Sequence, residues 1–282
     1  MLVAIDRQTL PLRRLVVVDN APDAANADVV EATATPTRYV PAPENLGPAG
    51  GLALGMDLLL EELDDDDWIL TLDDDDPPGD VALLAALFAF ARERHERDRN
   101  TGGVGLSGTR FDDRRGRIVR VPDDELHGAV PVDSIAGNQY PIYRCAAVRQ
   151  VGTLRPDLFF GFEELEFGLR LGRAGWSLYG HGPRWHAGRR AGGRLGHTAT
   201  PSRALDELTW RRYYSLRNLI YILRARGRTG AALRVTAVTG FVKPAMNLAR
   251  TPELAWRHLR VNARASRDGW TGRMGRTVEP TP

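Results

Sequence analysis

The sequence contains a single cysteine, Cys145, among 282 residues. One cysteine excludes an internal disulfide framework and any cysteine-rich zinc site. No apolar run approaches the roughly 18–20 residues that a bilayer-spanning helix needs. The opening segment, MLVAIDRQTLPLRR, is too short and too quickly charged for a secretory signal. There is also no GxxxxGK[ST] phosphate loop and no GxGxxG at a strand–helix junction. These absences favour a cytoplasmic protein.

The cationic side chains are almost all arginine, since Lys243 is the one lysine among 38 Lys and Arg. The net charge of +2 conceals an uneven distribution along the chain. Residues 181–282 hold 20 Lys and Arg against 5 Asp and Glu, a net +15, whereas residues 1–180 hold 18 against 31, a net −13. The front of the chain is therefore acidic and its tail is basic.

A length of 282 residues, 43% of them hydrophobic and 26% charged, is ordinary for a globular protein. The spacing of apolar residues predicts strands over LVVVDN (15–20), 37–43 and 68–72, and helices over 44–63 and 80–97. This order favours an α/β fold in which a mostly parallel sheet is flanked by helices.

The second half of the chain has shorter predicted elements. They are a hairpin around DDRRG within 103–121, a strand over 136–144 followed by a short helix, a helix over 161–176, a strand and turn over 177–188, and a mobile Gly- and Arg-rich loop over 189–203. From residue 205 onward the pattern is helical and basic. We therefore expect a front domain over 1–204 and a basic helical region over 205–282.

An aspartate run, 73–76, directly follows the third predicted strand and is stopped by two prolines. In parallel α/β sheets, ligands bind outside the carboxyl ends of the strands. Asp73 and Asp75 alternate there, and carboxylate oxygens are the ligands that Mg²⁺ and Mn²⁺ prefer. The alternative is a solvated turn, which is our interpretation of the other aspartate run, 64–67.

Other polar residues stand at similar positions, each with a structural alternative. Asp19 and Asn20 close the first strand, where they can meet a ribose or simply form an Asx turn. Glu163 and Glu164 open a helix, where a carboxylate can act as a general base or merely favour the helix dipole. His181 and His186 can ligate a metal or pack as ordinary side chains.

Taken in this order, the segments resemble glycosyltransferase family 2, particularly bacterial rhamnosyl- and galactofuranosyl-transferases. The resemblance covers about residues 1–225. It is carried by these segments: LVVVDN, ENLGPAGGLALGM, WILTLDDDDPP, AGNQYPIYR, the stretch from VRQVGTL to GRAGW, PRWHAGRRAGG, and WRRYYSLRNLIYILR with its Tyr-x-x-Arg-Asn pattern. The resemblance implies a GT-A fold, the nucleotide-diphospho-sugar transferase type, with a basic helical C-terminal extension.

The resemblance also implies roles for individual residues. Glu164, with Glu163 beside it, takes the place of the catalytic base, although the family has Asp where this chain has Glu164. The implied donor-binding residues are Asp19, Asn20, Asn45, Gly47 and Asp74. The implied ligands of a Mg²⁺ or Mn²⁺ ion are Asp73, Asp75 and His186, with His181 in reserve.

A second departure from the family concerns the start of the chain. Family members have a strand and a helix before the segment that LVVVDN resembles, and here MLVAIDRQTLP looks like the tail of that helix. The first strand is missing from the given sequence. We therefore expect the full protein to be longer by one strand and most of a helix.

The implied function is inverting, metal-dependent transfer of a sugar from a nucleoside-diphosphate sugar to a hydroxyl of a glycan or lipid-linked acceptor, in cell-wall or surface polysaccharide synthesis. The alternatives are a nucleotidyltransferase of similar fold, whose usual Gly-rich N-terminal signature is absent, and a non-catalytic sugar-nucleotide-binding protein.

The basic C-terminal region allows two interpretations. Its arginines stand on helices with Trp210, Tyr213, Tyr214 and Trp256, a combination that can lie on an anionic membrane surface. We therefore expect peripheral contact with the inner face of the cell membrane, or else a subdomain that packs on the front domain or forms a dimer. Nucleic acid is not an expected partner, because no recognised binding motif accompanies the charge.

Overall fold

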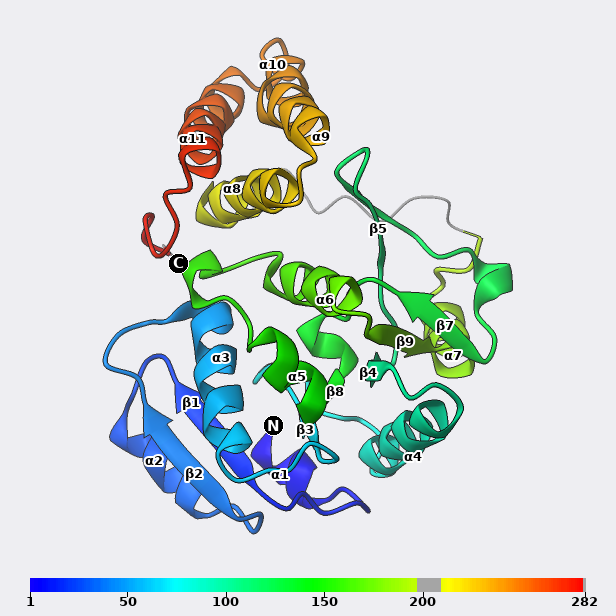
Figure 1. Cartoon of the computed structure of the whole chain (residues 1–282). Coiled ribbons are helices and arrows are strands. Elements are labelled where there is room, and N and C mark those ends of the chain that lie inside the picture. Colours follow the sequence, from blue (N-terminus) through cyan, green and yellow to red (C-terminus); the bar gives the residue numbers. More distant parts are fainter. Residues whose placement is uncertain (197–208, 281–282) are drawn as a thin grey trace.

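The computed structural model describes residues 1–196 and 209–280, and Figure 1 shows the arrangement of their helices and strands. The strands are β1 (Leu15–Asp19), β2 (Thr37–Pro41), β3 (Trp68–Leu70), β4 (Thr101–Gly105), β5 (Arg110–Asp112), β6 (Arg117–Val119), β7 (Ala129–Val132), β8 (Ile142–Arg144) and β9 (Ser177–His181). The α-helices are α1 (Leu2–Asp6), α2 (Ala24–Glu31), α3 (Gly47–Leu60), α4 (Leu83–Arg97), α5 (Cys145–Val151), α6 (Glu163–Arg173), α7 (Gly182–Ala191), α8 (Thr209–Ala225), α9 (Thr229–Arg234), α10 (Lys243–Ala245) and α11 (Pro252–Thr271). Short 3-10 segments are η1 (Asp123–Glu125), η2 (Gly137–Gln139) and η3 (Pro156–Leu158), and η4 (Val235–Val242) is a π-helix.

The sheets confirm the α/β class but not the expected mostly parallel pairing. The larger sheet has the order β3-β8-β4-β9-β7, and within it only β4 and β9 pair in parallel. The chain leaves β4 and returns to β8 at the same end, where the Leu106 N–H bonds the Gln139 carbonyl. A strand that returns at the end it left must run antiparallel, whereas β9 follows a crossover through α5 and α6. Outside this sheet, β1 pairs with β2 in parallel and β5 with β6 antiparallel, the latter being the predicted hairpin.

Helices cover the larger sheet, and apolar side chains fill the layers between them (Figure 1). One core cluster joins α3, α5 and α6 to the sheet through residues such as Ile69, Tyr143 and Phe167. Another packs Leu84 and Leu87 of α4 against a different part of the strands. These clusters place the carboxyl end of β3 and the start of α6 in a rigid frame.

The segment after β9 differs from the predicted turn and loop. Residues 182–191 form α7, because the His181 ring accepts a hydrogen bond from the Arg184 N–H at 3.3 Å and Pro183 suits the first turn. His181 also stacks on Phe90, with ring centroids 4.7 Å apart. The later part of the predicted mobile loop, 197–203, lies outside the described residues.

The helices of the basic region pack closely on one another and on the segment before α6. Tyr213 and Tyr214 of α8 are buried, and the Tyr213 hydroxyl donates to Asp268 of α11 at 2.6 Å. Phe159 joins this second core through a ring contact with Tyr214 at 4.9 Å. Within the part of the chain that the structure describes, no helix has the length and apolar character needed to cross a membrane.

Candidate functional site

Carboxylates from two distant parts of the chain meet around Gly137 of η2. The Glu164 side chain accepts a hydrogen bond from the Gly137 N–H at 3.2 Å. On the other side, a Cβ atom built at Gly137 would stand 2.6 Å from both carboxylate oxygens of Asp73. Asp73 follows β3, and Glu163 and Glu164 open α6, so the fold brings together three residues predicted from sequence as metal ligand and base. A larger residue at position 137 would force the Asp73 side chain or η2 to shift.

Burial changes the acid–base behaviour of the two glutamates. Glu163 is 5% exposed, and burial, with the charges of Glu164 and Asp73, raises its pKa well above the usual value. Its Oε2 atom is buried without a hydrogen-bond partner among the described residues. Burial also raises the pKa of Glu164, and hydrogen bonds from its own N–H and from Gly137 offset this only in part. Raised carboxyl pKa values in close neighbours are typical of acid–base sites.

The aspartate run supplies oxygen ligands that suit a hard divalent cation. Burial, and then the charges of Asp75, Asp74 and Asp76, raise the pKa of Asp73. A bound cation would relieve this repulsion, and Mg²⁺ is commonly held by one or two carboxylates together with substrate phosphates. Asp74 and Asp75 are exposed at the surface. The donor set therefore fits Mg²⁺ or Mn²⁺.

The predicted third ligand stands elsewhere in the chain, half-buried on α7 as His186. In residues 1–196 and 209–280, no three His, Cys, Asp or Glu side chains are grouped so that they could hold a metal ion. Asp73, Asp75 and His186 are thus not grouped in this structure, and their ligand roles stay predictions. His181, the reserve, has a structural role as the cap of α7.

Four of the five predicted donor-binding residues take part in two separate sets of hydrogen bonds, one around Asp19 and one around Asn20. Asp19 accepts from the Ala21 N–H at 2.9 Å in an Asx turn, and its other oxygen accepts from Asn26 and Tyr39. Burial alone would raise the pKa of Asp19, but these hydrogen bonds hold it below the usual value. The anticipated Asx turn is therefore present, and a role in binding a nucleoside stays a prediction.

The amide of Asn20 fastens the loop before α3 to β1. Its oxygen accepts from the Leu46 N–H at 2.9 Å, and its nitrogen donates to the Gly47 carbonyl at 3.3 Å. Asn45 in turn accepts from the Gly47 N–H at 2.9 Å. Gly47 has a φ of +67°, and a Cβ there would stand 2.3 Å from the Phe159 carbonyl oxygen. This loop thus lies directly against the segment that leads to Glu163 and Glu164.

That segment, residues 158–162, has an unusual backbone. Phe159 and Phe162 have φ values of 62° and 67°, and Gly161 has 80°. Positive φ at a bulky side chain costs about 1–3 kcal/mol, so the surrounding structure must hold it. Asn218 of α8 does so by donating to the carbonyls of Leu158, Phe160 and Gly161 at 3.0, 3.0 and 2.7 Å.

Arg217 supports the same segment, and sequence reasoning did not assign either residue a role. Arg217 is fully buried and donates to the Leu158 carbonyl at 2.9 Å and to the Asn218 side chain at 2.9 Å. It also stacks over the Tyr214 ring at 4.7 Å. A signal was present in the sequence, because Arg217 and Asn218 of the Tyr-x-x-Arg-Asn pattern stand directly between apolar residues of a predicted helix. Charged and amide side chains that are buried in a helix usually have a specific partner.

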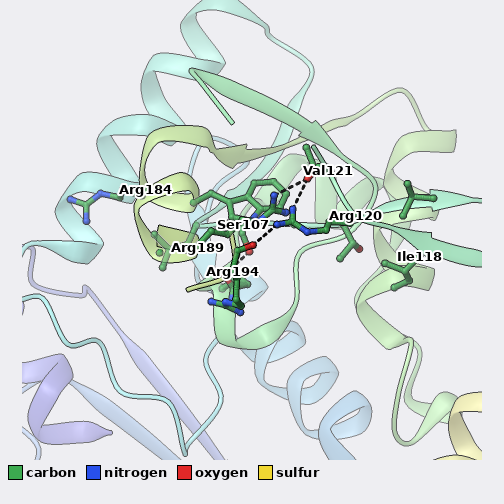
Figure 2. Close-up of a pocket in the computed structure, with 14 residues that line it drawn as sticks. Ser107, Ile118, Arg120, Val121, Arg184, Arg189 and Arg194 are labelled. Atoms are coloured by element: carbon green, nitrogen blue, oxygen red, sulfur yellow. Dashed lines mark hydrogen bonds between the residues drawn. The ribbon is translucent and has the colours of Figure 1, made fainter. Parts of the chain in front are cut away.

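A cavity of about 270 Å³ adjoins η2, whose Gln139 forms part of its wall. Figure 2 shows Arg120 and Arg189 converging beside Val121, whose carbonyl accepts from them at 3.1 and 2.8 Å. Both guanidinium groups also pair with Asp123, which offsets their charge. The remaining polar side chains of the wall include Ser107, Thr109, Arg184 and Arg194. The cavity therefore presents hydrogen-bonding groups more than uncompensated charge.

Comparison with known proteins finds that part of the chain is similar in sequence to glycosyltransferases. No family model matches it. Galactofuranosyltransferase GlfT1 of Mycolicibacterium smegmatis is 31% identical over 175 residues, which are 57% of this chain and 56% of that protein. GlfT1 of Mycobacterium tuberculosis is 30% identical over 170 residues, 57% of this chain and 55% of that protein. The match thus spans little more than half the length of these relatives.

Among solved structures, that of GalNAc-T7 with UDP, GalNAc and Mn²⁺ superposes with a TM-score of 0.53 at 11% identity, covering 95% of this chain and 52% of that one. At this identity the likeness shows the fold alone. The expected GT-A fold, and the sequence resemblance to galactofuranosyltransferases, are confirmed.

Proposed function

We propose that this protein is an inverting, metal-dependent glycosyltransferase that moves a sugar from a nucleoside diphosphate to a hydroxyl of a glycan or lipid-linked acceptor. The observation that carries the proposal is the arrangement of Glu163 and Glu164 beside Asp73 across Gly137. The sequence similarity to galactofuranosyltransferases supports it, and it is consistent with a role in cell-wall or surface polysaccharide synthesis.

Glu164 is the proposed general base. It takes the proton of the acceptor hydroxyl, the acceptor oxygen attacks the anomeric carbon from the opposite face, and the bond from that carbon to the diphosphate oxygen breaks with its electron pair. Burial and the charges of Glu164 and Asp73 raise the pKa of Glu163 well above its usual value, so protonation of Glu163 is favoured over a second negative charge beside Glu164. Its neighbour Glu164 can then stay ionised and accept a proton.

Asp73 and Asp75 are the proposed holders of the Mg²⁺ or Mn²⁺ ion. A divalent ion held by these carboxylates would neutralise the charge that develops on the departing diphosphate. The presence of Mn²⁺ with UDP in GalNAc-T7 supports this choice of cofactor. Asp19, Asn20, Asn45, Gly47 and Asp74 remain the proposed donor side, with Asn20 holding the loop 45–47 in place.

The cavity beside η2 is the proposed acceptor side. This choice rests on Gln139, which is part of the cavity wall and lies two residues after Gly137, whose N–H bonds Glu164. Hydroxyl and amide side chains with arginines suit a polyhydroxyl ligand, because each group can donate to or accept from sugar hydroxyls. A lipid-linked acceptor would also bring the enzyme to a membrane surface from the cytoplasmic side.

The test is calorimetric titration of the protein with nucleotide sugars in the presence and absence of Mn²⁺, followed by a transfer assay. Galactofuranosyl donors come first because of the named relatives. Glu164→Gln should keep donor binding and lose at least about a hundredfold in turnover. Glu96→Gln, on the exposed side of α4, is the matched control and should keep full turnover.

Three results would contradict the proposal. Near-normal turnover of Glu164→Gln would show that Glu164 is not the general base. Sugar transfer that continues unchanged in EDTA would show that Asp73 and Asp75 do not hold a catalytic metal ion. Binding of nucleoside triphosphates but not of nucleotide sugars would instead favour a nucleotidyltransferase, and nucleotide-sugar binding without any transfer would favour a non-catalytic binding protein.

A further inference from the structure

Exposed apolar side chains gather at one end of the helical region. Of the large hydrophobic residues that are exposed in the described structure, most belong to residues 233–256. Met246 is 74% exposed and Trp256 is 57% exposed. The full set, which we call the apolar tip, is Leu233, Val238, Phe241, Val242, Met246 and Trp256.

The geometry of η4 explains why these residues share a side. Its hydrogen bonds run from residue i to residue i+5, a rare arrangement that places residues four or five apart in line. Leu233, Val238, Val242 and Met246 follow this spacing. The helix α11, which carries Trp256, packs against η4 and α10. Figure 1 shows these helices at the end of the molecule remote from the larger sheet, with the β5–β6 hairpin reaching towards α9.

The aromatic residues expected at a membrane surface are mostly not available for that role. Trp210, Tyr213 and Tyr214 are 9%, 1% and 0% exposed, because they form the core between α8 and its neighbours. That part of the sequence-based expectation is wrong. Of the four aromatics, only Trp256 is at the surface.

Charge indicates what kind of partner the apolar tip fits. Between residues 229 and 261, Glu253 is the one acidic side chain, whereas the exposed cations are Arg234, Lys243, Arg250, Arg257 and Arg260. Apolar side chains bordered by cations match the headgroup region of a bilayer that contains anionic lipid. A second copy of the chain fits less well, because two positively charged faces repel each other.

We infer that the apolar tip inserts shallowly into the surface of an anionic membrane, with the surrounding arginines and Lys243 on lipid phosphates. The inference does not depend on the proposed transferase reaction, since it concerns residues of η4, α10 and α11. It goes beyond that function by naming the surface that would bring the catalytic domain to an acceptor embedded in lipid.

The experiment is co-sedimentation of the full chain with two kinds of vesicle. One kind is phosphatidylcholine alone, and the other is phosphatidylcholine with about 30% phosphatidylglycerol, which supplies anionic headgroups. The full chain should bind the anionic vesicles at least about tenfold more strongly, and added salt should weaken this binding. A double variant, Met246→Ser with Trp256→Ser, should lose about tenfold in binding to anionic vesicles. The pair Arg250→Glu with Arg257→Glu should lose at least as much.

The matched control is Val3→Ser with Val29→Ser, two exposed apolar residues far along the chain from the tip, and it should bind like the unaltered protein. Circular dichroism shows whether each variant is folded, and transfer to a water-soluble acceptor should stay unchanged in all of them. Equal binding to both kinds of vesicle, or no binding by the folded protein, would overturn the inference. So would a dimer in light scattering that Met246→Ser with Trp256→Ser converts to monomer, because the tip would then serve self-association.

Discussion

The side-chain amide of Asn218 lies 2.7 Å from the carbonyl oxygen of Gly161 and donates a hydrogen bond to it. This contact joins the helix α8 to the backbone two residues before Glu163. The same amide also donates to the carbonyls of Leu158 and Phe160, so one side chain fastens a segment that includes three positive φ values. The basic C-terminal region therefore holds the backbone segment that leads to Glu163 and Glu164, without itself carrying the carboxylates.

Replacing Asn218 by alanine should lower both stability and turnover. The carbonyls of Leu158, Phe160 and Gly161 would lose a partner in a buried setting, which costs about 1–3 kcal/mol of the free energy of unfolding. Urea denaturation measures this loss. Because Glu163 and Glu164 would move, kcat should fall more than tenfold while KM for the donor changes little, and the acid limb of the pH profile should shift.

Asn100→Ala is a suitable control for that prediction, because Asn100 is exposed on the loop before β4. If Asn218→Ala loses stability but keeps kcat and its pH profile, the residue supports the fold only and does not position the glutamates.

A methyl group at Gly137 should separate the carboxylates of the site. In Gly137→Ala the new Cβ would stand 2.6 Å from both Asp73 oxygens, so Asp73 or η2 must move. A displacement of about 1 Å at a catalytic group can cost on the order of a hundredfold in rate. We expect such a loss in kcat/KM, together with weaker Mn²⁺ binding in calorimetry. Gly79→Ala is the control, since no atom lies within 4 Å of a Cβ there, and equal activity of the two variants would contradict the prediction.

Replacing Glu163 by glutamine should stabilise the protein at neutral pH. Burial raises the pKa of Glu163, so the folded state binds more protons than the unfolded state between the two pKa values. Stability from this group is therefore present at low pH and is lost as the pH rises through that window. The neutral amide removes this loss. Thermal unfolding should be measured from about pH 4 to about pH 8, a range that begins near the ordinary carboxyl pKa. The melting temperature should fall less with rising pH for Glu163→Gln than for the unaltered chain.

The pH dependence of transfer should report the ionisation of Glu164. The base acts only when ionised, and burial raises its pKa above the ordinary glutamate value of 4.5. The kcat/KM should therefore rise with pH through a limb that lies above 4.5. The residual activity of Glu164→Gln should lack this limb. A limb at or below the ordinary glutamate value would show that another group, or no base, controls the rate.

Local sequence patterns were sufficient for much of the fold. The β-branched run of β1, the apolar spacing of α3 and α4, and the Gly that follows α6 are signals between near neighbours in the chain. The same patterns predicted that Asp73 follows the end of a strand and that Glu163 and Glu164 begin a helix. The antiparallel return of β8 and the helix α7 were not predicted, because strand direction depends on where a long connection re-enters the sheet, and α7 depends on a cap from His181.

The sequence by itself determined the chemical inventory: carboxylates after one strand and at the start of one helix, and a basic C-terminal region with few acids. Only the tertiary structure decided which of these side chains meet. Asp73 and Glu164 are separated by many residues and come together on either side of Gly137, where partial burial raises the pKa of each. It also decided which aromatics of the basic region are core and which are surface, since burial is a property of the packed helices rather than of any local pattern.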